Sequence, residues 1–206
     1  MLPLLVVWVL QSCVILTTYS EPLPDNLVDE LRRGGYTIYF RHAPTEWSQR
    51  DQVSTLADCS SCDPKRMRQL SDEGRDMARR VGDAMRKLGI PVGEVLASEY
   101  CRTVETAKLL GLGRVTTTRD VINARVASLI GGREKLRRAA RAHLSAPPAE
   151  GTNTVIVAHG NVFLLAAGTR PAELGAAVVR ADGEGGFSVE AMLDPEDWIE
   201  LAISPR

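Results

Sequence analysis

Two apolar runs constrain this chain most, because each one ends directly on residues that carry a charge or an imidazole. The first run is YTIYF at residues 36–40, and the second is TVIVA at residues 154–158. Short runs of β-branched and aromatic residues are typical of central strands that are covered on both faces. The first is followed by Arg41 and His42, and the second by His159. The sequence therefore predicts polar groups at the carboxyl ends of two buried strands.

Helical patterns alternate with these strands. The spacing of apolar residues predicts a short helix over 25–33, a longer one over 72–88, and a third over 103–110 that follows a strand at 94–97. A further helix is expected over 123–143, where two basic clusters favour a solvated face. Alternating strands and helices predict an α/β fold with a mostly parallel sheet, in which ligands bind outside the carboxyl ends of the strands.

Two segments depart from this alternation. Residues 43–70 carry little periodicity, and so long an excursion in a compact fold favours a lid or the rim of a pocket. Near the end, VVRAD and FSVEAM flank a glycine-rich turn at residues 182–186, which predicts a hairpin at the edge of the sheet.

Length and charge limit the classes of protein. A chain of 206 residues, 44% of them hydrophobic, fits a single domain with one substantial core. Lys and Arg total 25 against 26 Asp and Glu, so no overall field favours nucleic acid or an anionic membrane as a partner. Any anion specificity must therefore be local.

Residues 1–20 contain no charged side chain and are mostly apolar. This composition favours a signal peptide or membrane anchor over a buried core helix, with cleavage after Ser20 as the simple form. A lipidation site at LQSC is the less favoured alternative, because Gln occupies its second position. We expect an exported protein, periplasmic or extracellular, which contacts a membrane only if residues 1–20 are retained.

The chain has four cysteines, and in an oxidising compartment some of them are expected to form a disulfide. Cys13 lies in the leader, which leaves Cys59, Cys62 and Cys101. The C-x-x-C pair is only half a zinc site, so no metal is predicted. A disulfide is expected instead, either between Cys59 and Cys62 or between one of them and Cys101.

Arg41, His42, Arg102 and His159 form a set that suits phosphoryl transfer. This reaction needs a nucleophile in line with phosphorus and cations around the equatorial oxygens. A neutral imidazole can attack phosphorus, and a neighbouring guanidinium both binds phosphate and disfavours protonation of the ring. Neither a metal nor a cofactor is required.

Three motifs carry a resemblance to a known family. They are R-H-A at residues 41–43, S-E-Y-C-R-T-V-E-T-A at 98–107 and V-A-H-G at 157–160. In order and in context they resemble the histidine phosphatase superfamily, whose fold is phosphoglycerate mutase-like. A wider pattern resembles a secreted bacterial subgroup of it, in the stretches FRHAPTEWSQRD, LSDEGR and IPVGEVLASEYCRT.

The resemblance implies a fold, an activity and roles. The fold is a single domain with three layers, α/β/α, over about residues 25–206. His42 would accept the phosphoryl group, Arg41 and Arg102 would clamp it, and His159 would complete the pocket. The implied activity is a metal-independent hydrolysis of phosphate monoesters, on a phosphorylated small molecule or a phosphoprotein.

The chain also departs from the family pattern. Ala43 stands where a Gly is usual, and Gly160 stands where the acid phosphatase branch has Asp. The mutases carry a proton-donating Glu near the position of Asn123. The proton donor is therefore open, with three carboxylates as candidates: Glu46, Glu99 and Asp120.

Other readings remain at this point. The same pocket would serve a phosphotransferring mutase, or a protein that binds and senses phosphate with little catalysis, and small family members act on phosphohistidine in proteins. Arg66 or Arg68 could line the rim, Trp47 could cover a substrate or pack under the loop, and His143 is expected on the solvated helix. Nothing indicates the oligomeric state.

Overall fold

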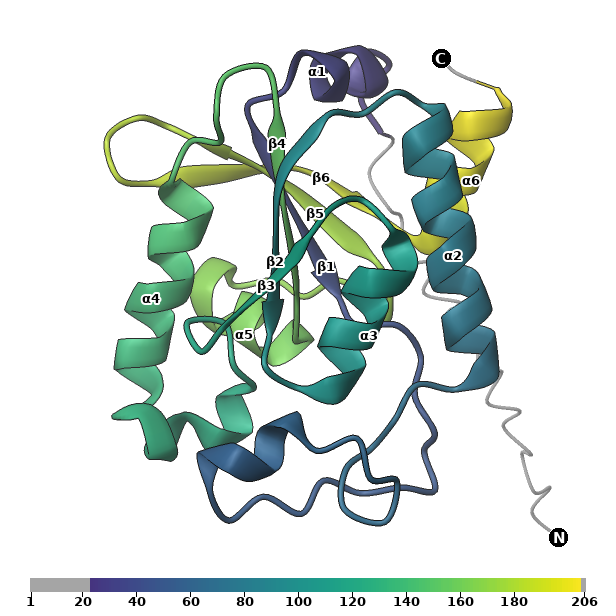
Figure 1. Ribbon diagram of the computed structural model, residues 1–206. Coiled ribbons are helices and arrows are strands. Elements are labelled where there is room, and N and C mark those ends of the chain that lie inside the picture. The colour runs from purple at the N-terminus through teal and green to yellow at the C-terminus, as the bar shows by residue number, and fades with distance from the viewer. Residues whose placement is uncertain (1–22, 205–206) are drawn as a thin grey trace, which may run out of the picture.

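The computed structural model describes residues 23–204. The predicted signal peptide or anchor at residues 1–20, with Cys13, lies outside them. The predicted fold is confirmed, because the strands form a single sheet in the order β3-β2-β4-β1-β5-β6 (Figure 1). The strands are β1 (Tyr36–Arg41), β2 (Val92–Ser98), β3 (Val115–Thr118), β4 (Asn153–Ala158), β5 (Ala176–Ala181) and β6 (Phe187–Leu193).

The four strands β3, β2, β4 and β1 are parallel, whereas β5 and β6 form the predicted antiparallel hairpin at the edge. The register of the parallel strands determines which residues lie side by side at their carboxyl ends. Arg41 pairs with Ala158, so the residues that follow β1 and β4 emerge side by side. Ala97 of β2 pairs with Val157 of β4, which brings the end of β2 to the same place.

Helices cover both faces of the sheet, as the three-layer prediction requires (Figure 1). One face packs against α1, α2, α3 and α6, and the other against α4 and α5. Within residues 23–204, none of these helices is both long and apolar enough to cross a membrane. The helices are α1 (Leu27–Arg33), α2 (Asp72–Lys87), α3 (Cys101–Leu110), α4 (Arg133–Ser145), α5 (Gly160–Ala167) and α6 (Pro195–Ile203).

Side chains of successive strand residues enter opposite layers. Phe40 packs in the core below α2 and α6, where its ring lies 6.0 Å from that of Trp198. Tyr39 points to the other layer and lies 4.8 Å from the ring of Phe163. This alternation buries both faces of β1, and it accounts for the continuous apolar run in the sequence.

The helix predicted over 123–143 is confirmed in the second part of this segment, where α4 carries both basic clusters, but it does not extend over the first part. The segment forms a 3₁₀ helix, Ala124–Ile130, and then α4, with Gly131 and Gly132 between them. Both glycines have a positive φ, 96° and 99°, which a continuous right-handed helix does not allow. The short edge strand β3 and the helices α5 and α6 were not predicted, since short elements have little room to show a period.

The long excursion of residues 43–70 is tied down at both ends and in its middle. Thr45 and Leu70 form an isolated antiparallel bridge. Between them the segment contains one 3₁₀ helix, Leu56–Ser60. A disulfide joins Cys62 to Cys101, whose Cα atoms are 5.3 Å apart, and Cys59 is a buried free thiol. Of the pairings that the sequence left open, the structure has the one that ties this loop to the first residue of α3.

Candidate active site

His42 follows the last residue of β1 and is 4% exposed. Its Nδ1 lies 2.9 Å from the backbone oxygen of Ala43. A carbonyl oxygen can only accept, so Nδ1 carries the proton and donates it. In a neutral ring, Nε2 then keeps its lone pair, which is the arrangement that a nucleophilic imidazole needs.

The surroundings of His42 keep the ring neutral. Burial lowers the pKa of His42 well below its ordinary value, and the guanidinium of Arg102 lowers this pKa further, followed by Arg41 and Arg68. The hydrogen bond to Ala43 opposes this effect and is outweighed by it. His42 is therefore an unprotonated base inside a cluster of arginines, and such a cluster attracts an anion.

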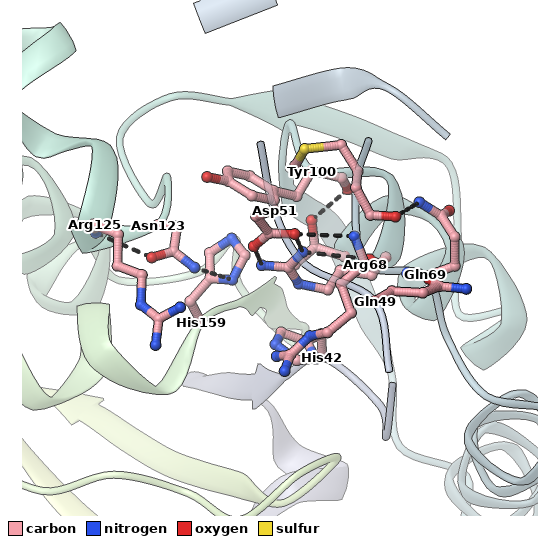
Figure 2. A network of polar contacts seen from close by, with 12 residues as sticks. His42, Gln49, Asp51, Arg68, Gln69, Tyr100, Asn123, Arg125 and His159 are labelled. Atoms are coloured by element: carbon pink, nitrogen blue, oxygen red, sulfur yellow. Dashed lines mark hydrogen bonds and ion pairs between the residues drawn. The ribbon is translucent and has the colours of Figure 1, made fainter. Parts of the chain in front are cut away.

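His159 follows β4 and precedes α5, and its ring centroid lies 5.5 Å from that of His42. Its Nδ1 is 3.2 Å from Nδ2 of Asn123. The Oδ1 of Asn123 accepts from the backbone N–H of Arg125 and from Asn161, so the amide nitrogen faces the ring and donates (Figure 2). The proton of a neutral ring is then on Nε2, 3.0 Å from Oγ of Ser98.

Asn123 thus takes a role that the sequence did not predict. It occupies the region where mutases carry a glutamate, and an amide cannot release a proton, but it fixes the tautomer of His159. Burial, and then Arg102, lower the pKa of His159 well below its ordinary value, so both histidines are neutral. The pocket consequently has two uncharged imidazoles among several guanidinium groups.

Arg102 lies in the first turn of α3 and is 2% exposed. Its Nη1 and Nη2 each lie 3.0 Å from one carboxylate oxygen of Asp51, which comes from the long loop. Nη1 also lies 3.4 Å from the backbone oxygen of Arg68, and the guanidinium carbon lies 4.6 Å from the ring centroid of Tyr100. Figure 2 shows Asp51 and Arg68 together on the side of His159 opposite Asn123.

Arg41 forms an ion pair with Glu173, with 2.8 Å between Nη2 and Oε1. Gly160, the residue after His159, leaves space for the side chain of Arg41. A Cβ added at Gly160 would lie 3.0 Å from Cδ of Arg41 and 2.7 Å from the side chain of Arg170. An aspartate at this position would crowd both arginines, which gives a physical reason for the glycine that the chain carries there.

The two predicted rim arginines differ in position. Arg66 is half exposed and pairs with Asp58, whereas Arg68 contributes to the lowered pKa of both His42 and His159. The guanidinium of Arg68 also lies 4.5 Å from the ring centroid of Trp47. Because Trp47 is 71% exposed, packing beneath the loop does not explain this side chain.

The three proposed proton donors have other partners. Both carboxylate oxygens of Glu99 accept from Arg119, and Asp120 bonds His143 on α4. Glu46 is exposed, and together with Glu99 it lines a cavity of about 900 Å³ whose lining includes neither His42 nor His159. In the described part of the chain, no hydrogen bond or ion pair joins any of the three to the histidine pair. The structure therefore brings none of them into this pocket by a direct contact.

Asp51 and Glu173 were both missed by sequence reasoning. They are half-buried carboxylates that pair with the arginines of the pocket. One lies in a loop without periodicity and the other precedes β5, so no local pattern marks either of them. Only long-range contacts, across 51 and 132 residues, reveal them.

Comparison with known proteins agrees with this geometry. A model of the histidine phosphatase superfamily (branch 1) matches residues 38–125, which include Arg41, His42 and Arg102. Residues 38–125 carry the histidine phosphatase pattern. The predicted resemblance is confirmed over this segment, and it supports phosphatase activity on a phosphorylated substrate. Comparison with curated protein sequences finds no match.

Solved structures share the histidine phosphatase fold at low identity. The protein histidine phosphatase SixA, in complex with tungstate, is 15% identical, with a TM-score of 0.54 over 79% of this chain and 98% of SixA. A mycobacterial glucosyl-3-phosphoglycerate phosphatase is 16% identical (TM-score 0.53; 77% and 98% covered). A phosphoserine phosphatase from Entamoeba histolytica is 13% identical (TM-score 0.52; 77% and 96% covered).

The neutral histidines predict a pH dependence of stability. An unfolded histidine binds its proton near pH 6.5, whereas these two do so only at much lower pH when folded. Below about pH 6.5 the unfolded state therefore binds more protons than the folded state. As the pH is lowered, the free energy of unfolding decreases by up to about 1.4 kcal/mol per pH unit for each histidine. Above pH 7 this contribution to the pH dependence vanishes.

Urea unfolding at pH 7.0 and 5.5 measures this effect. In His42→Gln, the loss of stability between the two pH values should be smaller than in the native chain by about 1 kcal/mol. His143→Gln, which removes a histidine of α4 outside the pocket, is the matched control and should retain the native loss. Equal losses in all three proteins would show that His42 is not held neutral by the fold.

Proposed function

We propose that the chain hydrolyses phosphate monoesters through a phosphohistidine on His42. The observation that carries this proposal is the hydrogen bond from Nδ1 to the oxygen of Ala43, because it leaves Nε2 unprotonated beside Arg102 and Arg41. A lone pair surrounded by cations is suited to attack on a group that carries negative charge.

The reaction has two steps. In the first, Nε2 of His42 attacks phosphorus, the bond from phosphorus to the ester oxygen breaks with its electron pair on that oxygen, and the alkoxide takes a proton from water as the alcohol leaves. In the second, water attacks the phosphohistidine, the P–N bond breaks, and inorganic phosphate leaves with His42 neutral again. Arg41 and Arg102 would stabilise the equatorial oxygens, on which charge is spread in the transition state, and the neutral His159 would complete the pocket beside His42.

Electrostatics favours this chemistry over simple binding. The arginines lower the cost of bringing a dianion into a buried site, and the neutral His42 needs no deprotonation before attack. The product histidine carries a phosphoryl group rather than a proton, so the cations that oppose protonation stabilise it. All of these charges come from the chain itself, and we expect activity in the presence of a chelator.

The experiment is turnover of p-nitrophenyl phosphate and a panel of phosphate esters by the full chain with EDTA present. A rapid quench should trap an acid-labile, alkali-stable phosphoprotein. A panel that also contains a phosphohistidine peptide and labelled sugar phosphates separates the alternatives. Transfer of label to a second hydroxyl instead of water would favour a mutase, and binding of phosphate without turnover of any substrate would favour a sensing protein.

We also propose that the protein is exported. The uncharged residues 1–20 and the disulfide between Cys62 and Cys101 support an oxidising compartment outside the cytoplasm. Cell fractionation and N-terminal sequencing of the protein from its own host test this. A mature chain that begins at Glu21 is the expected result, and an intact, reduced chain in the cytoplasm would contradict it.

A further inference from the structure

The guanidinium of Arg102 is held on three sides by groups that do not belong to the predicted catalytic set. The ring of Tyr100 covers one face at 4.6 Å, the carboxylate of Asp51 bonds the outer edge, and the backbone oxygen of Arg68 bonds Nη1 from the side. An arginine side chain loses several freely rotating bonds when it is fixed. Three contacts of this kind give it a single orientation before any ligand arrives.

The number of donors shows what is left for a ligand. A guanidinium has five N–H donors, one on Nε and two on each terminal nitrogen. Asp51 takes one from Nη1 and one from Nη2, and the oxygen of Arg68 takes the second from Nη1. The remaining two, on Nε and Nη2, lie side by side along one edge, and their spacing suits two oxygens of a phosphate.

This free edge is buried and has no partner. Nε of Arg102 is enclosed in the protein without a hydrogen bond in the described part of the chain, although Arg102 is only 2% exposed. A buried donor without an acceptor costs about 1–3 kcal/mol, so natural structures rarely keep one without a reason. An anion that bonds this edge would remove that cost.

We propose that Asp51 is a positioning residue, which holds Arg102 so that its Nε and Nη2 edge faces the phosphoryl group. The proposal rests on the proposed function, since it deepens the role of the same pocket. Asp51 does not compete with phosphate, because its carboxylate bonds the edge formed by Nη1 and Nη2 and leaves the edge formed by Nε and Nη2 free. Asp51 and the backbone of Arg68 are then the parts of the loop that belong to the site, and their contacts determine the orientation of Arg102.

The loop itself is built to hold Asp51 in place. The backbone N–H of Arg68 donates to Oδ1 of Asp51 at 3.0 Å, and the backbone N–H of Gln69 donates to the side chain of Gln49 at 2.8 Å (Figure 2). These two bonds join residues 49–51 to residues 68 and 69 within the loop. The carboxylate accepts three hydrogen bonds in all, which fix it in one orientation.

The test compares Asp51→Asn with Asp51→Glu. The amide of Asn has a similar shape but one acceptor in place of two, so one terminal nitrogen of Arg102 loses its partner. We expect kcat/KM to fall about 100-fold for every ester in the panel, because a displacement of about 1 Å in a site has effects of this size. Asp51→Glu keeps the charge and both oxygens and should recover part of the loss.

Two further measurements separate positioning from other roles. Calorimetric titration with orthovanadate and with inorganic phosphate should show weaker binding to Asp51→Asn by about tenfold or more, a readout that needs no turnover. If the proposed catalysis fails while phosphate still binds, this measurement still decides the role of Asp51. The pH profile of kcat/KM should keep its shape, since Asp51 would transfer no proton.

A matched control comes from the same loop. Asp58 pairs with the half-exposed Arg66 and caps the 3₁₀ helix, so Asp58→Asn disturbs the loop without touching Arg102. Its kinetic constants should stay within about twofold of the native values. Three results would overturn the proposal: unchanged binding and kinetics in Asp51→Asn, tighter phosphate binding in it, or a loss confined to esters with poor leaving groups.

Discussion

Replacement of His42 by alanine is expected to lower kcat/KM by about 10⁴- to 10⁶-fold, the range that follows loss of a covalent nucleophile. Alanine removes both the attacking Nε2 and the hydrogen bond to the oxygen of Ala43. No acid-labile phosphoprotein should be trapped from this variant. Stopped-flow assays with p-nitrophenyl phosphate and the quench described above measure the two effects separately.

Binding shows that the loss comes from chemistry and not from unfolding. The guanidinium groups remain in His42→Ala, so it should still bind orthovanadate or inorganic phosphate. His143→Ala removes a histidine of α4 whose Nε2 bonds Asp120, away from the pocket, and it should keep activity within about twofold. Residual activity in His42→Ala above one part in a hundred would place the nucleophile elsewhere.

The second large effect concerns stability. The double variant Cys62→Ser with Cys101→Ser removes a disulfide that closes a segment of 39 residues. Loop-closure entropy predicts a loss of about 4 kcal/mol in the free energy of unfolding for a closed loop of about 40 residues. Urea or guanidinium unfolding of the native and double-variant chains measures this difference directly.

The same change should also affect catalysis. Cys101 is the residue before Arg102, and Cys62 belongs to the loop that carries Asp51, so the disulfide links both members of that ion pair. We expect kcat/KM to fall in the double variant even where it remains folded. Cys59→Ala leaves the disulfide intact and serves as the control, with a loss of about 1 kcal/mol for a small buried cavity. Equal unfolding free energies in the double variant and the native chain would contradict the prediction.

The organisation of the pocket explains why these effects differ in kind. His42 and His159 are fixed by the ends of neighbouring strands, and the parallel register leaves them no freedom to separate. Arg102 comes from a helix, and its orientation depends on a loop that is held by a disulfide. Substitution of His42 therefore removes a reacting group, whereas changes in the loop alter how well the arginine is aligned.

Much of the fold could be predicted from the sequence, and the reason is local. The apolar runs that end on Arg41 and on His159 indicated two buried strands, because a strand covered on both faces needs apolar residues at every position. The same runs placed His42 and His159 at one edge of a parallel sheet. The one helix expected over 123–143 differs in its first part, because Gly131 and Gly132 separate a 3₁₀ helix from α4.

The motifs by themselves indicated the resemblance to histidine phosphatases, the histidine pair and two arginines, since these residues directly follow predicted strands or lie at the start of a predicted helix. Tertiary structure alone decided the rest: the pairing of Cys62 with Cys101, the orientation of Asn123 toward His159, and the contact of Asp51 with Arg102. Each of these joins residues that are 36 to 51 positions apart. The order of residues along the chain carries no local signal for such contacts, because they depend on how loops lie across the finished sheet.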